Sequence, residues 1–219
     1  MVLGNCGRKL LCLVLAVAGA VVHVTAIAQP VSVQNVRFAR DRAPGMDGHW
    51  LETAVELRGG PSVEGGEGHA ARFNSRIEVI FQAAYAVGDA TAAGYEFYRS
   101  RAEITALAQN QRVFVYFYLP PEIVDRDRLQ REPYAWRVAL SVDGQPLPNA
   151  PEQYSRNLGD PQAAQSFLRH MTENAPKNDG VLLPIYLTPF YQRESGRFRN
   201  LPSFIRREPT PAAREEADP

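Results

Sequence analysis

The chain has 219 residues, of which 45% are hydrophobic and 22% charged, with 24 basic and 24 acidic side chains. This balance argues against nucleic acid or an anionic membrane surface as the main partner, because proteins that bind either carry an excess of Lys and Arg.

Residues 1–28 have the three-part layout of a secretory signal peptide. A short basic stretch is followed by an apolar run over 10–24 and then by the small-residue triplet Ala26-Ile27-Ala28. We therefore expect cleavage before Gln29 and a periplasmic, cell-surface or extracellular location. The alternative is an uncleaved membrane anchor, because the apolar run extended through the triplet approaches the roughly 20 residues that cross a bilayer.

Cleavage would remove both cysteines, Cys6 and Cys12. The mature chain would then have no thiol, which excludes disulfides, thiolate metal sites and a cysteine nucleophile together. Loss of Arg8 and Lys9 would leave 22 basic and 24 acidic residues, a net charge of −2. Stability must then come from the hydrophobic core, for which a chain of about 190 residues is long enough.

Residues 31–142 show the two-residue alternation of half-buried strands, in about seven short runs bounded by Gly, Pro, Asn or Asp. The first run, 31–36, leads into a charged turn, and a later glycine-rich stretch, 59–71, predicts a mobile loop. The longest strand is expected over 73–87. One of its faces should carry Phe73, Ile77, Val79, Phe81, Ala83, Tyr85 and Val87.

The run 111–119 differs from the others because both of its faces are apolar. Val113, Val115, Phe117 and Leu119 alternate with Phe114, Tyr116 and Tyr118. Such a strand is usually covered on both sides, by its own domain or by a partner. Phe114, Tyr116 and Tyr118 are therefore candidates for a protein-contact surface, unless the late helix covers them as ordinary core.

After residue 144 the apolar period becomes helical. Asp160-Pro161 is a typical cap and first residue, and it begins an amphipathic helix near 160–175. An apolar strand is expected over 181–187, at a sheet edge because of Pro184. These elements predict a mainly β fold, an antiparallel Ig-like β-sandwich with one late amphipathic α-helix, over residues 29–191.

From 192 to 219 the sequence is Arg-rich and then rich in Pro and Glu, and we interpret it as a disordered tail. Its start offers an alternative, because arginines there are interleaved with Phe198, Leu201, Phe204 and Ile205. Such a segment can also dock on a neighbour.

No catalytic or metal-binding motif is evident. None of His49, His69 and His170 has a second histidine or a cysteine at ligand spacing, and His69 with its glycine and glutamate neighbours is interpreted as a solvated loop. There is no serine in a glycine elbow and no phosphate-binding loop. We expect no enzyme, no cofactor and no metal, with a dispersed Ser, His and Asp hydrolase as the third hypothesis.

The second hypothesis is a secreted carbohydrate-binding module. Trp50 and Trp136 are the candidate stacking residues for a sugar ring, although alternation places most of the aromatic residues in the core.

Three segments together resemble the secreted pilus-like proteins of Verrucomicrobia, a family associated with type IV pilus gene clusters. They are Tyr95-Glu96-Phe97-Tyr98, the run 113–122, and the stretch from Arg126 to Trp136. The resemblance implies an Ig-like sandwich outside the cytoplasm, acting as an accessory or surface component of a pilus-like system, with no catalytic residues.

The resemblance also sets the expected partners: envelope or pilus-system proteins, or further copies of the chain, and no nucleic acid. Contact with the membrane is expected only through the uncleaved signal during export. A glycine-plus-glutamate prepilin site does not precede the apolar run, so we expect an associated protein rather than a pilus subunit.

The signal peptide makes a direct prediction. The exported protein should begin at Gln29, which mass spectrometry of its N-terminal peptide would reveal. A full-length product in the cytosol that keeps Met1 would contradict both cleavage and export.

Overall fold

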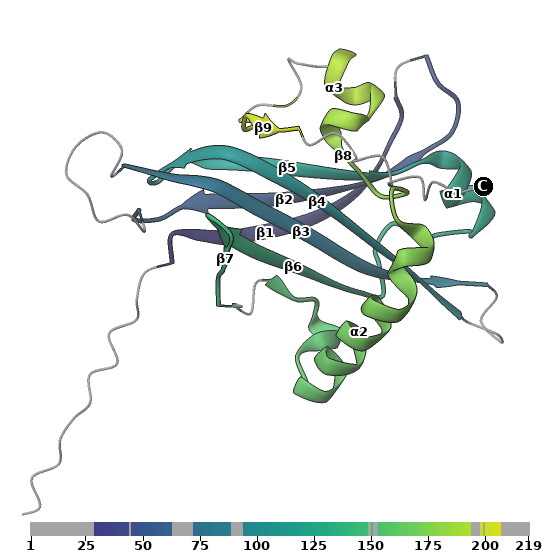
Figure 1. Ribbon diagram of the computed structural model, residues 1–219. Helices are drawn as coiled ribbons and strands as arrows, with labels where there is room; N and C mark the ends of the chain where they lie inside the picture. The colour runs from purple at the N-terminus through teal and green to yellow at the C-terminus, as the bar shows by residue number, and fades with distance from the viewer. Residues whose placement is uncertain are drawn as a thin grey trace, which may run out of the picture.

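The computed structural model describes residues 29–43, 45–62, 72–88, 94–148, 150, 153–193, 198 and 200–206. Within them the chain forms two antiparallel sheets packed face to face (Figure 1). This confirms the predicted mainly β sandwich with one longer helix late in the chain. The predicted signal peptide, 1–28, and His69 lie outside the described residues.

The first sheet has the strand order β1-β2-β5-β8, and the second has the order β7-β6-β3-β4-β9. The strands of the first sheet are β1 (Val31–Asp41), β2 (Trp50–Gly59), β5 (Arg112–Leu119) and β8 (Leu183–Pro184). Those of the second are β7 (Gln145–Pro146), β6 (Ala135–Val142), β3 (Phe73–Val87), β4 (Gly94–Ala108) and β9 (Phe204–Ile205). Of the four edges, β1 alone is formed by a strand longer than two residues.

The helices lie outside this sandwich. They are α1 (Pro121–Arg126), α2 (Pro161–Asn174) and α3 (Pro189–Arg193), with short 3-10 turns η3 (Arg156–Leu158), η4 (Ala175–Asn178) and η5 (Ile185–Leu187). The carboxylate of Asp160 caps α2 by accepting from the Ala163 N–H. In the described part of the chain, no helix combines the length and apolar character that a membrane crossing requires.

The core lies between the facing sheets. Successive side chains of a strand point to opposite faces, so every second side chain points into this core. Val55, Val115 and Val138 are fully buried there. The rings of Phe81 and Phe117 stack across the interface, with centroids 5.7 Å apart. α2 packs Phe167 and Met171 against the outer face of the second sheet, over Ala84 and Ala135.

The longest strand breaks the predicted alternation at one position. Arg76 adopts a left-handed backbone, with φ of 47°. On its N-terminal side Asn74 is buried and Phe73 is 44% exposed, the reverse of the expected face. The amide of Asn74 donates to the carbonyl oxygens of Pro30 and Gly60, which explains why a polar side chain occupies this inward position.

The C-terminal segment also differs from the prediction. The expected strand over 181–187 is reduced to β8, and η5 follows it directly. Phe198 is only 6% exposed, and Phe204 and Ile205 pair with β4. The prediction of a disordered tail is therefore wrong for residues 198 and 200–206. Phe198 is buried on the chain's own sandwich, and Leu201, Phe204 and Ile205 are partly buried.

Tyr98 joins the core to the end of α1. Its hydroxyl donates to Asp127 Oδ2 at 3.0 Å, and Arg126 donates to both carboxylate oxygens of Asp127 at 2.7 Å. The Arg126 guanidinium, followed by the Tyr98 hydroxyl, holds the pKa of Asp127 below its usual value of 3.8.

Packing of Phe190 on α3 against the sandwich leads to a prediction about stability. Phe190→Ala should lower the free energy of unfolding by about 3–5 kcal/mol, because it empties a fully buried aromatic site. Urea denaturation would measure the loss. Leu187→Ala is the matched control: its side chain is 61% exposed, so it should change stability by less than about 0.5 kcal/mol. Equal effects of the two changes would contradict this packing.

Asp127 makes a prediction about pH. Its folded pKa is lowered, so its contribution to stability is present above pH 3.8 and is lost as pH falls through the folded value. Asp127→Asn should lower the free energy of unfolding by about 1 kcal/mol at pH 7, and the difference from wild type should shrink below pH 3.8. Denaturation curves across pH 2–7 would show a constant difference if the carboxylate had no such role.

Candidate functional site

The outer face of the first sheet carries an exposed cluster of one arginine and two aromatic rings. Arg37 on β1 is aligned with Ala54 on β2 and Tyr116 on β5. Since Ala54 is small, Arg37 reaches across β2, and its Cζ lies 5.1 Å from the ring centroid of Phe114. The rings of Phe114 and Tyr116 are 6.1 Å apart. We call Arg37, Phe114 and Tyr116 the aromatic patch.

Tyr118 does not belong to this patch, which corrects one of the three predicted contact residues. It is fully buried, and Phe190 stacks on it with centroids 4.4 Å apart. Its hydroxyl donates to Glu52 Oε2 at 2.8 Å. Burial, reinforced by the Glu52 charge, raises the pKa of Tyr118. The residue is part of the core because the C-terminal segment folds back over it.

The C-terminal segment covers the outer side chains of β5 to different extents. Tyr116 is half-buried and meets the edge of Phe198, with centroids 4.9 Å apart. Phe114 is half-buried, and its N–H donates to the Asn200 carbonyl oxygen at 3.2 Å. The cover is therefore not the late helix, as the core alternative supposed. α2 lies on the other sheet, and Ile185, Phe190 and Phe198 pack over the Tyr118 end of β5 (Figure 1).

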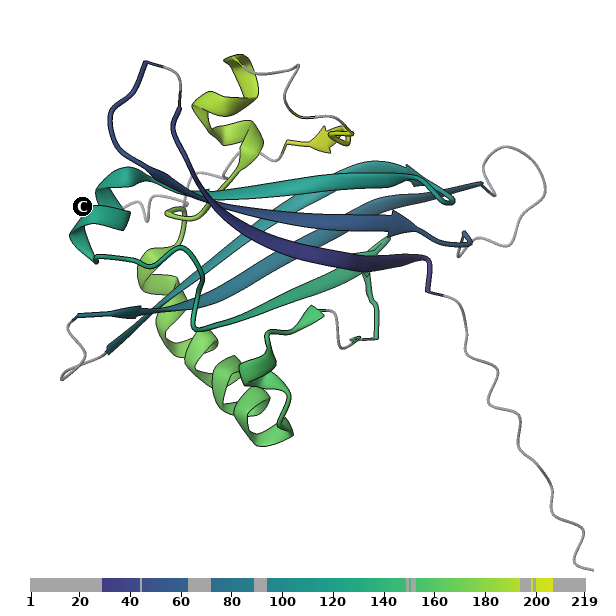
Figure 2. The ribbon, with the colours of Figure 1, turned by 180° about the vertical axis from the view of Figure 1, so that it is seen from behind.

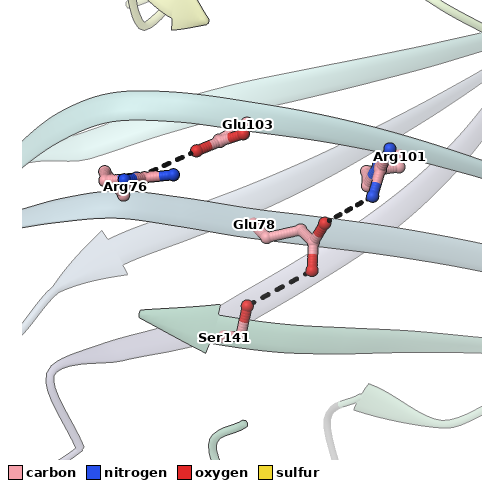
Figure 3. A network of polar contacts seen from close by, with 5 residues as sticks. All are labelled: Arg76, Glu78, Arg101, Glu103 and Ser141. Atoms are coloured by element: carbon pink, nitrogen blue, oxygen red, sulfur yellow. Dashed lines mark hydrogen bonds and ion pairs between the residues drawn. The ribbon is translucent and has the colours of Figure 1, made fainter. Parts of the chain in front are cut away.

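The outer face of the second sheet has a different character beyond α2. Glu78 on β3 accepts from Arg101 on β4 at 3.2 Å and from Ser141 on β6 at 3.4 Å. Arg76 and Glu103 pair at 3.4 Å, and both networks run across the strands (Figure 3). Opposite charges paired across strands stabilise a solvated sheet face. This face therefore lacks the aromatic character of the first sheet's patch.

A groove lies where the β1 edge of one sheet approaches β6 of the other. Its volume is about 620 Å³. The aromatic part of its lining is Phe38, Tyr134, Trp136 and Tyr154, and the polar part includes Gln34, Asn35, Glu132, Ser155, Arg156 and Asn157. We call it the β1–β6 groove.

The two tryptophans proposed for sugar stacking have different positions. Trp136 is half-buried and lines the β1–β6 groove, with its ring 6.0 Å from that of Phe38. Trp50 is only 5% exposed. It packs edge-on to Phe190, at 5.6 Å, and to Tyr118, at 6.3 Å. The prediction of Trp50 as a stacking residue is wrong, because the C-terminal segment encloses it.

Hydrogen bonds from backbone and side-chain groups hold the wall of the groove in place. The Trp136 N–H donates to Ser155 Oγ at 3.1 Å, and the Ser155 N–H donates to the Trp136 carbonyl oxygen at 3.0 Å. Tyr154 forms a bridge with Arg137. The Asn157 amide donates to the Tyr134 carbonyl oxygen at 2.6 Å. The loop and β6 therefore form one rigid wall.

A smaller cavity adjoins the groove. It has a volume of about 270 Å³ beside α2, and it shares Tyr134 and Asn157 with the groove. Tyr134 is 53% exposed and Tyr95 is 43% exposed, with their rings 4.9 Å apart. The two cavities are thus joined through an exposed tyrosine pair.

Among the described residues, no group of three or more His, Cys, Asp or Glu side chains is placed to hold a metal ion. Nε2 of His49 accepts from Arg42, and His170 lies 3.7 Å from the carboxylate of Glu173.

Several residues of these surfaces were missed by sequence analysis. Arg37 lies beyond the expected end of the first strand, because that strand continues to Asp41. Tyr154 lies in an irregular segment with no periodic signal, whereas Tyr134 begins the alternation that continues into β6. Phe198 was recognised as apolar within a basic tail, and that interleaving was the signal for its docking on the chain's own domain.

No protein-family model matches the chain, and no curated protein matches it. A crystal structure of a protein from Akkermansia muciniphila is similar to it in fold. The TM-score is 0.56 at 14% sequence identity, over 82% of this chain and 95% of that one. At this identity the likeness shows the fold alone.

Proposed function

We propose that this chain is an exported, non-enzymatic β-sandwich that works by protein contact, as an accessory or surface component of a pilus-like system. The observation that carries the proposal is the aromatic patch. Arg37 is exposed, and Phe114 and Tyr116 keep part of their surface open on a rigid sheet. Aromatic residues and arginine are the types enriched at the centres of protein interfaces.

The setting is supported by two independent observations. The N-terminal sequence has the layout of a signal peptide, and the fold is shared with a protein from a member of the Verrucomicrobia. Verrucomicrobia is also the phylum of the secreted pilus-like family that the sequence resembles. Together they support a pilus-related sandwich at the cell surface, whose partners would be envelope or pilus-system proteins.

The patch gives a binding prediction. The exported protein, immobilised, should retain an envelope or pilus-system protein from the bacterium that produces it. Phe114→Ala and Arg37→Glu should each raise the Kd for that protein about tenfold or more, as expected for a central interface residue. Surface plasmon resonance with the purified partner would measure the change.

Phe73→Ala is the matched control, because Phe73 is an exposed phenylalanine outside the patch. It should bind like the wild type. A protein that stays monomeric and retains no envelope protein would overturn the proposal, as would equal losses in the control and the patch variants.

A further inference from the structure

We infer that the β1–β6 groove is a binding site for a neutral oligosaccharide. This goes beyond the proposed protein contact and rests on another surface of the molecule. The groove combines aromatic rings with polar side chains on a rigid wall. Packing of the hydrophobic core alone would not require this combination.

The chemistry of a sugar ring matches this lining. A pyranose has an apolar C–H face, which packs on an aromatic ring, and a rim of hydroxyls, which need hydrogen-bonding partners. Trp136 and Phe38 provide the aromatic floor, tilted by 59° to one another. The exposed ring of Tyr134 stands at the junction with the second cavity.

The polar groups stand on both sides of that floor. Gln34 is exposed at the bulge of β1, and Asn157 is exposed on the facing wall. Carboxamides donate and accept at once, as hydroxyl groups also do. These side chains are therefore suited to the hydroxyl rim of a sugar whose ring lies on Trp136.

Charge and size narrow the class of ligand. Glu132 and Arg156 are the charged side chains in the lining, one of each sign. An anionic polymer or a phosphate group would require a net positive site. The groove volume of about 620 Å³ lies within the roughly 300–1,000 Å³ of typical ligand cavities. A few sugar units fit this space, and a longer chain would continue over Tyr134 toward Tyr95.

An extended peptide added to β1 is the rival occupant. In the described part of the chain, β1 is an edge strand paired on one side only. The register of β1 shifts between Val33 and Asn35, inside the groove. Such an irregularity disrupts the regular ladder that an added strand needs. Arg37 and Arg40 further disfavour edge pairing, so the groove is better suited to a sugar.

The test is titration calorimetry of the exported protein with cellohexaose, xylohexaose, mannohexaose and chitohexaose. Saturable binding of at least one hexasaccharide is expected. Trp136→Ala should weaken it about tenfold or more, and Gln34→Ala by about threefold to tenfold, as expected for one hydrogen bond. Trp50→Phe leaves Trp136 as the single tryptophan, so its fluorescence should shift on binding.

Phe114→Ala is the control, because it alters the aromatic patch and leaves the groove intact. It should bind the sugar normally even if it loses the protein partner, so the two proposals fail separately. If Trp136→Ala does not fold, the exposed-site variants Tyr134→Ala and Gln34→Ala provide the test. Absence of binding to all four sugars overturns the inference. So does unchanged affinity in both exposed-site variants, or selection by the groove of an extended peptide instead of a sugar.

Discussion

Strand β5 is apolar on both faces, and a sheet strand of this kind leaves a hydrophobic surface unless something covers each side. Its inner side chains pack against the second sheet, where Phe117 stacks on Phe81. Its outer side chains are covered by the chain's own C-terminal segment, through the stacking of Phe190 on Tyr118. The C-terminal segment buries Tyr118 completely and leaves Phe114 and Tyr116 partly open, and this difference determines where the aromatic patch lies.

The C-terminal segment closes one side of the sandwich and leaves the other open. β8 pairs with β5, and β9 pairs with β4, so one chain segment attaches to an edge of each sheet. On the opposite side β6 pairs with the two-residue β7 and bridges to Tyr154, and no described strand joins it to β1 (Figure 2). The β1–β6 groove lies on this side, where β1 forms the edge of its sheet.

β1 contributes to both candidate surfaces because successive side chains of a strand point to opposite faces. Arg37 lies over Phe114 on the outer face, whereas Phe38 lines the groove beside Trp136. One edge strand thus contributes to both the proposed protein-contact patch and the proposed sugar site.

Local patterns in the sequence determined the strand and helix types, the apolar character of both β5 faces and the cap of α2. These features depend on neighbouring residues, which is why alternation and capping rules predicted them. The left-handed turn at Arg76, which reverses the buried face of β3, has no local signal of that kind. Tertiary structure alone decided that Phe190 covers Trp50 and Tyr118, and that Trp136 faces a groove. Burial of those rings depends on contacts between segments more than 60 residues apart, such as Tyr118 and Phe190 with Trp50, and no periodicity within one strand records which distant segment will cover it.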